Sequence, residues 1–184
     1  MTLINMHQKN FIAELCRSTE CRLYLELGIF SGSTIDAVRK ACPACRCVGV
    51  DICDYRTDKT SEFVHLANDE FFQIFRGTAD VIFIDANHDY EPVMRDFLNS
   101  LAHLSTGGTI ILHDVDPGEA RLLATTECSD AYKIIDYIRD VREDLNVVTL
   151  PIGKEGLAVV TRNTDRRVYN YDETGRIYTR NFVV

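Results

Sequence analysis

The sequence lacks the features that would place it among nucleic-acid-binding, membrane-spanning or secreted proteins. It has 28 acidic and 20 basic residues, for a formal net charge of −8, and no basic stripe offsets the acids. This charge disfavours binding to a phosphate backbone, so we expect no nucleic-acid partner. The longest apolar stretches have the length of a strand, so we expect no membrane span. The first ten residues are polar, so we expect no secretory signal.

A disulfide framework is not expected either. The seven cysteines are odd in number and no signal peptide is expected, so we predict reduced thiols in a cytoplasmic protein. Cys42, Cys45 and Cys47, with Cys16 and Cys21, raise the alternative of a zinc site. A usual zinc site combines two close-spaced ligand pairs. Small buried thiols are therefore the favoured interpretation.

The chain is long enough, and apolar enough at 46%, for one domain with a core. No internal repeat or low-complexity linker is present. Strand-like and helix-like segments alternate, which predicts an α/β fold with a mostly parallel sheet and helices on both faces. The strands are predicted at 23–27, 47–51, 63–66, 81–85, 109–112, 147–150 and 157–160.

Four helices are predicted between these strands. One covers 10–16, and another begins with Ser31 as its cap. A third opens near Asp89, carries an apolar face through Leu104 and is ended by the glycines at 107–108. The fourth has its apolar face at 134–141.

The last two predicted strands of the sheet are joined by the short segment 151–156. A connection this short cannot make a parallel crossover, so the two strands must be antiparallel. From about residue 162 the chain becomes polar, and two short segments around 172–175 predict a hairpin. We therefore divide the chain into a domain at 1–162 and a hairpin-like extension at 163–184.

Four of the predicted parallel strands end in polar or acidic residues, at Glu26, Asp51, Asp85 and the pair 113–114. In open α/β sheets, ligands bind outside the carboxyl ends of the strands. These residues are far apart in the sequence, yet they should meet in one crevice.

The first strand runs into a turn that contains Gly28, Phe30, Ser31 and Gly32. Glycines let the backbone turn sharply and approach a ligand closely. The nicotinamide-binding fingerprint requires glycine where Phe30 stands. Glu26 would repel a pyrophosphate but suits a cofactor that carries a positive amino group, such as S-adenosylmethionine. An ordinary strand–helix turn remains an alternative.

Two further positions suit a nucleoside. Asp51 ends the second strand, where a carboxylate can accept both hydroxyls of a ribose. The pair Asn68 and Asp69 follows the third strand and could face an adenine. A solvated acid at the strand end is the alternative for Asp51.

The strongest candidate for a catalytic site is the group formed by Asp85, His88, His113 and Asp114. Two nearby carboxylates repel unless a cation or a proton lies between them. Their oxygens favour magnesium, calcium or manganese. We therefore predict a divalent cation, magnesium or manganese, as an option at Asp85, His113 and Asp114. The two histidines are the candidate catalytic bases.

Together these residues resemble the class I S-adenosylmethionine-dependent methyltransferases. The likeness is greatest to small-molecule O-methyltransferases related to the catechol and caffeoyl-coenzyme A enzymes. The segments that carry it are FIDANHDY (83–90), RDFLNS (95–100), GGTIILHDV (107–115), NDEFF (68–72) and YKII (132–135).

The resemblance implies a Rossmann-like seven-stranded sheet with one antiparallel strand. It implies that Glu26, Gly28 and Gly32 hold the amino-acid end of the cofactor, and Asp51 its ribose. In the metal-dependent relatives an acid at the place of Asp85 and an Asp-Asn pair at 113–114 hold magnesium. His113 departs from that pattern, and His88 stands where some relatives have a lysine base.

The expected reaction is direct transfer of a methyl group to an oxygen of a small molecule. The sequence does not identify the acceptor. No long insertion could form a cap, so the pocket is either open or closed by a second subunit in a homodimer. The rival interpretations are a nucleotide-dependent oxidoreductase and a protein that binds S-adenosylmethionine without catalysis.

Overall fold

The computed structural model describes the backbone of residues 6–163, 167–171 and 177–182, and side chains within 6–163. Its helices are α1 (Gln8–Ser18), α2 (Ser33–Ala41), α3 (Asn68–Ile74), α4 (Tyr90–Ala102), the 3-10 helix η2 (Ala120–Leu123) and α5 (Lys133–Val141). Its strands are β1 (Leu23–Leu27), β2 (Arg46–Asp51), β3 (Glu62–His65), β4 (Ala79–Ile84), β5 (Leu104–His113), β6 (Leu145–Leu150), β7 (Leu157–Arg162), β8 (Arg167–Tyr171) and β9 (Ile177–Phe182).

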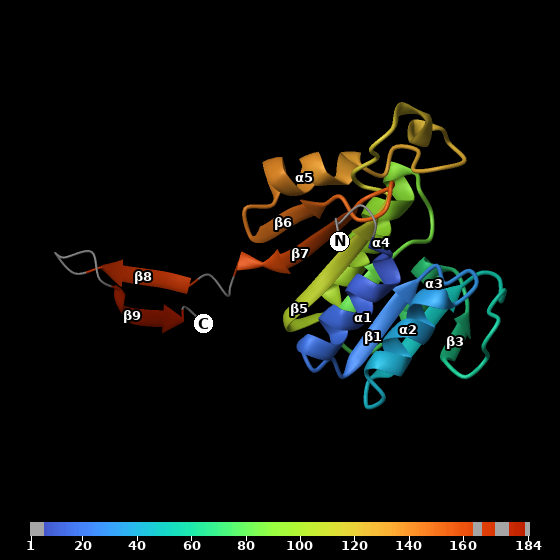
Figure 1. Ribbon diagram of the computed structural model, residues 1–184, viewed down its shortest axis with the longest axis horizontal. Helices are drawn as coiled ribbons and strands as arrows, with labels where there is room; N and C mark the ends of the chain where they lie inside the picture. Colours follow the sequence, from blue (N-terminus) through green and yellow to red (C-terminus); the bar gives the residue numbers. More distant parts are fainter. Residues whose placement is uncertain (1–5, 164–166, 172–176, 183–184) are drawn as a thin grey trace.

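A seven-stranded sheet in the order β3-β2-β1-β4-β5-β7-β6 forms the centre of the fold (Figure 1). The strands from β3 to β5 pair in parallel, whereas β7 runs antiparallel to both β5 and β6. The predicted mostly parallel sheet with one antiparallel strand is therefore confirmed. The order reverses between β1 and β4, which places a topological switch point at the carboxyl ends of these two strands.

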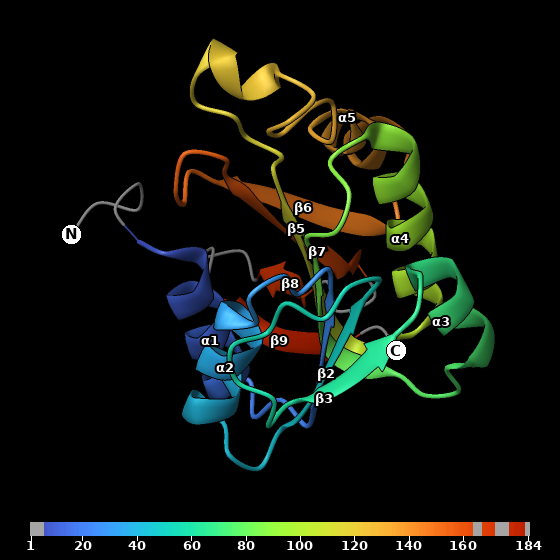
Figure 2. The same cartoon turned by 90° about the vertical axis from the view of Figure 1, so that its right-hand side faces the viewer.

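Helices cover both faces of this sheet, as predicted. Helices α1 and α2 lie on one face, and α3, α4 and α5 lie on the other (Figure 2). Residues of β1 contribute to both faces. Tyr24 packs in the core beneath α1 and α2, whereas Leu25 and Leu27 pack in the core beneath α3, α4 and α5. The strands are consequently buried on both faces, which explains why their sequences read as apolar runs.

Two predicted helix boundaries are wrong, the start of α2 and the end of α4, and glycines lie near both of them. Gly32, with a φ of 78°, is the N-cap residue of α2, so Ser31 does not cap that helix. Leu104 belongs to β5 rather than to α4, which ends at Ala102. The carbonyl of His103 accepts a hydrogen bond from the Ala79 amide at 2.9 Å, which starts the pairing of β5 with β4.

The glycines at 107–108 bend β5 instead of ending a helix. Their place is marked by a register shift, because Ala79 pairs with Leu104 and Val81 with Thr109. A Cβ on Gly108 would lie 2.8 Å from the Leu104 side chain and 3.0 Å from the Asp80 carbonyl.

Strands β8 and β9 pair antiparallel with each other in a separate two-stranded sheet. This agrees with the predicted hairpin, although its predicted turn at 172–175 lies outside the described residues. None of the helices in the described part of the chain has the length and apolar character that a membrane crossing requires.

The turn after β1 touches the turn after β4 through Gly28. This residue has a φ of 80°, and a Cβ there would lie 2.3 Å from the Asp85 carbonyl oxygen. Two backbone segments therefore meet at a separation that only glycine permits.

We expect Gly28→Ala to lower the free energy of unfolding by more than about 2 kcal/mol, because it adds both backbone strain and a backbone clash. Urea denaturation would measure the change. Gly118→Ala is the matched control, since its Cβ would meet only the Lys154 carbonyl at 3.6 Å. Equal stability of the two variants would contradict the close approach.

Candidate active site

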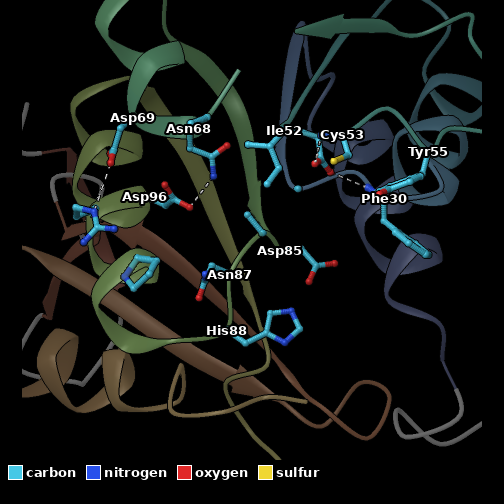
Figure 3. Close-up of a pocket in the computed structure, with 16 residues that line it drawn as sticks. Phe30, Ile52, Cys53, Tyr55, Asn68, Asp69, Asp85, Asn87, His88 and Asp96 are labelled. Carbon is cyan, nitrogen blue, oxygen red and sulfur yellow. Dashed lines mark hydrogen bonds and ion pairs between the residues drawn. The ribbon is translucent and has the colours of Figure 1, made fainter. Parts of the chain in front are cut away.

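A cavity of about 630 Å³ opens at the carboxyl ends of β1, β2 and β4. Several predicted site residues line it together, as the topology required: Gly28, Phe30, Asp51, Asn68, Asp69, Asp85 and His88. Figure 3 shows Asn68, Asp69 and Asp96 on one side of this space, Phe30 and Tyr55 on the opposite side, and Asp85 and His88 between them. The cavity has the size of a small-molecule or cofactor site.

The other predicted residues do not line this cavity. Glu26 is 2% exposed, and its carboxylate accepts a 2.6 Å hydrogen bond from the Tyr24 hydroxyl. Burial raises the pKa of Glu26 well above its usual range. Ser31 and Gly32 belong to the turn that leads into α2, and His113 and Asp114 lie behind Asp85.

Asp51 is held in place by backbone amides. One of its carboxylate oxygens accepts hydrogen bonds from Ile29 at 2.9 Å and Phe30 at 3.1 Å, and the other accepts from Cys53 at 3.0 Å. A carboxylate can accept about four hydrogen bonds, so it keeps capacity for a ligand hydroxyl. The same bonds fix the turn that carries Phe30.

Three exposed apolar side chains form a lip along this part of the cavity. Phe30, Ile52 and Tyr55 are 72%, 66% and 63% exposed. The rings of Phe30 and Tyr55 lie 6.0 Å apart between their centroids. An organic ligand in the cavity would cover apolar surface that otherwise faces water.

At the opposite side, Asn68 begins α3 and donates a 2.7 Å hydrogen bond to the carboxyl group of Asp96. Asp96 projects from α4 and is 5% exposed. Burial raises its pKa to about 6, although the bond from Asn68 acts in the opposite direction. Asp96 was not predicted as a site residue, although it lies in the segment RDFLNS (95–100) that carries part of the family resemblance.

Asp85, His113 and Asp114 lie together at the ends of β4 and β5. The Nδ1 atom of His113 lies 3.1 Å from Asp85 Oδ1 and 3.0 Å from Asp114 Oδ2. The N–H direction is aligned with neither oxygen, so this buried nitrogen has no well-formed hydrogen bond. The three ligand atoms lie within 4.8 Å of one another.

Burial lowers the pKa of His113, but the two aspartates outweigh it and raise the pKa to about 10. His113 therefore holds its proton at neutral pH and places positive charge between the two carboxylates. A residue that keeps its proton at this pH is a poor general base.

His88 is placed differently from His113, because it lines the cavity and is partly exposed. Its Nδ1 contacts the carbonyl of Glu127, which fixes Nδ1 as the donor, and its Nε2 lies 3.3 Å from Asp114 Oδ2. If Nε2 takes a proton, the Asp114 carboxylate stabilises the imidazolium that forms. Of the two predicted bases, this geometry favours His88.

Comparisons with known proteins found a family of similar sequence and solved structures of similar fold. Residues 25–115 match the sequence model of a family described as "Methyltransferase domain". This segment of the chain is therefore similar to methyltransferase domains. No curated protein sequence matches it.

Solved structures similar to this chain include cofactor-bound Rv0187 from MTB, with a TM-score of 0.70 and 18% identity over 84% of this chain and 79% of that chain. The O-methyltransferase from Bacillus cereus in complex with SAH has a TM-score of 0.66 and 20% identity, over 84% and 80% of the chains. The O-methyltransferase TomG from Streptomyces achromogenes in complex with SAM has a TM-score of 0.66 and 17% identity, over 84% and 79%. At these identities the likeness establishes the fold alone, which is the Rossmann-like fold of these methyltransferases.

The buried carboxyl group of Asp96 predicts a pH-dependent stability. Its native pKa of about 6 exceeds the unfolded value of 3.8, so the native state binds more protons between these values. Its contribution to stability is therefore largest at low pH and is lost as the pH rises through 6, up to about 3 kcal/mol.

We expect Asp96→Asn to become more stable relative to the unmodified protein as the pH rises from 5 to 7, and the difference to level off above 7. Urea denaturation at several pH values would measure it. Asp69→Asn, which removes a half-exposed carboxylate that lines the same cavity, is the matched control. A pH-independent difference for Asp96→Asn would contradict a buried, proton-binding carboxyl group.

Proposed function

We propose that the protein transfers a methyl group from S-adenosylmethionine to an oxygen of a small molecule. The observation that carries the proposal is the acidic cavity at the strand ends, which opens directly onto His88. The carboxylates of Asp51, Asp69 and Asp85 line this cavity. Arg95 is the one lysine or arginine among the described residues that line it. An excess of carboxylates suits a cofactor with a sulfonium and an ammonium group, and disfavours a pyrophosphate.

The orientation of the cofactor follows from the two sides of the cavity. Asp51 retains acceptor capacity for ribose hydroxyls, and Asn68 and Asp96 lie beyond it at the other side, within reach of an adenine. The amino-acid end would then lie near Gly28, where the absence of a Cβ brings two backbone segments together. Glu26 would act from beneath this turn, since it is buried and does not line the cavity.

Bound S-adenosylmethionine would supply a methyl group on a positively charged sulfur, which is a good leaving group. The protein must therefore hold the acceptor in line with that methyl group and remove its proton. His88 accepts the proton at Nε2, and Asp114 stabilises the resulting charge. Alignment contributes up to about 7–11 kcal/mol in favourable cases, and a base a factor of about 10²–10⁴.

A divalent cation at Asp85, His113 and Asp114 is a further part of the proposal. The buried Nδ1 of His113 without an aligned partner and the two facing carboxylates fit such an ion, which would replace the His113 proton. When bound, the cation would orient an acceptor hydroxyl and lower its pKa. One imidazole among the oxygen ligands favours manganese over magnesium.

We expect His88→Gln to lower kcat by a factor of about 10²–10⁴, because the variant has no proton acceptor at the position of Nε2. Methyl transfer from labelled S-adenosylmethionine to a panel of phenols, catechols and sugars would identify an acceptor and give kcat. Calorimetry should show binding of S-adenosylhomocysteine in both proteins. His7→Gln, at an exposed histidine on α1's N-terminal side, is the control.

Binding of the cofactor product without any methylated acceptor would favour a non-catalytic binding protein. The absence of heat with either S-adenosylmethionine or S-adenosylhomocysteine would refute the proposed function altogether.

We expect Mn²⁺ to bind the protein with release of a proton near neutral pH, because the ion displaces the proton of His113. Calorimetry in buffers of different ionisation enthalpy would count the protons. Asp114→Asn should lose this binding, whereas Asp69→Asn should keep it. Equal Mn²⁺ affinity in both variants would place the ion elsewhere.

A further inference from the structure

Cysteines gather at the end of the sheet opposite the cavity. Four buried ones, Cys16, Cys21, Cys45 and Cys47, pack in the core under α1 and α2, with the partly exposed Cys42 beside them. Cys16 lies at the end of α1 and Cys21 just before β1. Cys42 and Cys45 lie between α2 and β2, and Cys47 lies at the start of β2. All are reduced, and the proposed reaction uses none of them.

Cys21 and Cys45 form a close pair within this cluster. Their sulfur atoms lie 3.6 Å apart. The chain segments that carry them run side by side, because Arg46 donates a 2.9 Å hydrogen bond to the Arg22 carbonyl and pairs with Leu23. A disulfide bond is about 2.0 Å long, so rotation about the side-chain bonds has only a short gap to close.

Cys45 is also within reach of a small reagent. Together with Cys47 it lines a second cavity of about 380 Å³, bordered by Arg39, Arg46 and Glu62. Cys45 and Cys21 are similarly buried, at 7% and 5% exposed, but Cys21 does not line this cavity. A small oxidant would therefore meet Cys45 first.

Contacts among the thiols shift the pKa values of Cys45 and Cys21 in opposite directions. Hydrogen bonds with the thiols of Cys21 and Cys47 lower the pKa of Cys45. Contacts with Cys16 and Cys45 raise the pKa of Cys21. The thiolate is the nucleophile, and the Cys45 sulfur is the member of this pair that lines the cavity where a reagent can enter.

A metal site is the main alternative use of such a cluster. Among the side chains of residues 6–163, the one group of three ligand atoms within 4.8 Å of one another is Asp85, His113 and Asp114. The sulfurs are thus arranged as a pair with neighbours rather than as a tetrahedral set.

We propose that Cys21 and Cys45 are a redox-active dithiol that a peroxide converts into a disulfide. The Cys45 thiolate attacks one peroxide oxygen, the O–O bond breaks, and a sulfenic acid and hydroxide form. The Cys21 sulfur then attacks the Cys45 sulfur, the S–S bond forms and the S–O bond breaks. Both leaving hydroxides take up the thiol protons, so two thiols and one peroxide give one disulfide and two waters.

The bond would link the start of β1 to the start of β2 around α2. The two cysteines are 24 positions apart in the chain. Closing a loop of this length restricts the unfolded chain, so oxidation should raise the midpoint of thermal unfolding by roughly 5–10 °C.

The test oxidises the full chain with hydrogen peroxide, alkylates the remaining thiols and maps the cysteines by non-reducing peptide mass spectrometry. We expect a peptide that joins Cys21 to Cys45, loss of alkylation at these two positions, and retained alkylation at Cys42. Dithiothreitol should reverse both the link and the rise in thermal midpoint. Cys45→Ser should abolish the link, and Cys42→Ser should leave it unchanged.

Three results would overturn the proposal. The extent of alkylation at Cys21 and Cys45 would be the same with and without peroxide, or the disulfide would join Cys16 to Cys21 instead. In the third case, Cys45 would be oxidised to sulfinic acid without forming a disulfide. The alkylation map of the unmodified protein decides among them even if Cys45→Ser does not fold.

Discussion

Two carboxylates, Asp85 and Asp114, lie close together at neighbouring strand ends because positive charge lies between them. In this structure His113 supplies that charge, at 3.1 and 3.0 Å from the two aspartates. Without it, two largely buried carboxylates would repel each other and the ends of β4 and β5 would separate. The position of His88 depends on the same group, since its Nε2 faces Asp114. Charge balance at this point therefore determines the geometry of the whole acceptor side of the cavity.

The rest of the cavity is organised by backbone groups. Three amides fix Asp51, and the contact between Gly28 and the Asp85 carbonyl fixes the distance between the turns after β1 and β4. Such a rigid frame positions a cofactor with little cost in conformational entropy. The lip of Phe30 and Tyr55 adds exposed apolar surface beside Asp51, on the open side of the cavity. The two parts of the cavity thus differ in construction, since ion pairs hold Asp85 and Asp114 whereas backbone amides hold Asp51.

The sequence was sufficient to predict which strand ends meet, because a parallel sheet brings them to one edge whatever their side chains are. It was not sufficient to predict which of these side chains face the cavity. His113 and Asp114 lie behind Asp85, and Glu26 lies beneath the turn. Asp96 escaped notice because its role depends on the packing of α4 against Asn68, 28 positions away in the chain. Leu104 was placed in a helix because it continues the spacing of 97 and 101. The pairing of β5 with β4 decides that position, and no local pattern reports it.

The two ends of the sheet carry different chemistry, and the strands between them are rigid. At the carboxyl ends lie carboxylates and the two histidines His88 and His113; at the amino ends of β1 and β2 lie thiols in an apolar core. Strand β1 has five residues, so at about 3.3 Å per residue roughly 15 Å separate the two regions. A covalent link at the sulfur end would therefore change the stability of the sheet before it changes the cavity. Any effect on cofactor binding would have to pass through β1 to Gly28, whose backbone lies so close to the Asp85 carbonyl that no Cβ fits between them.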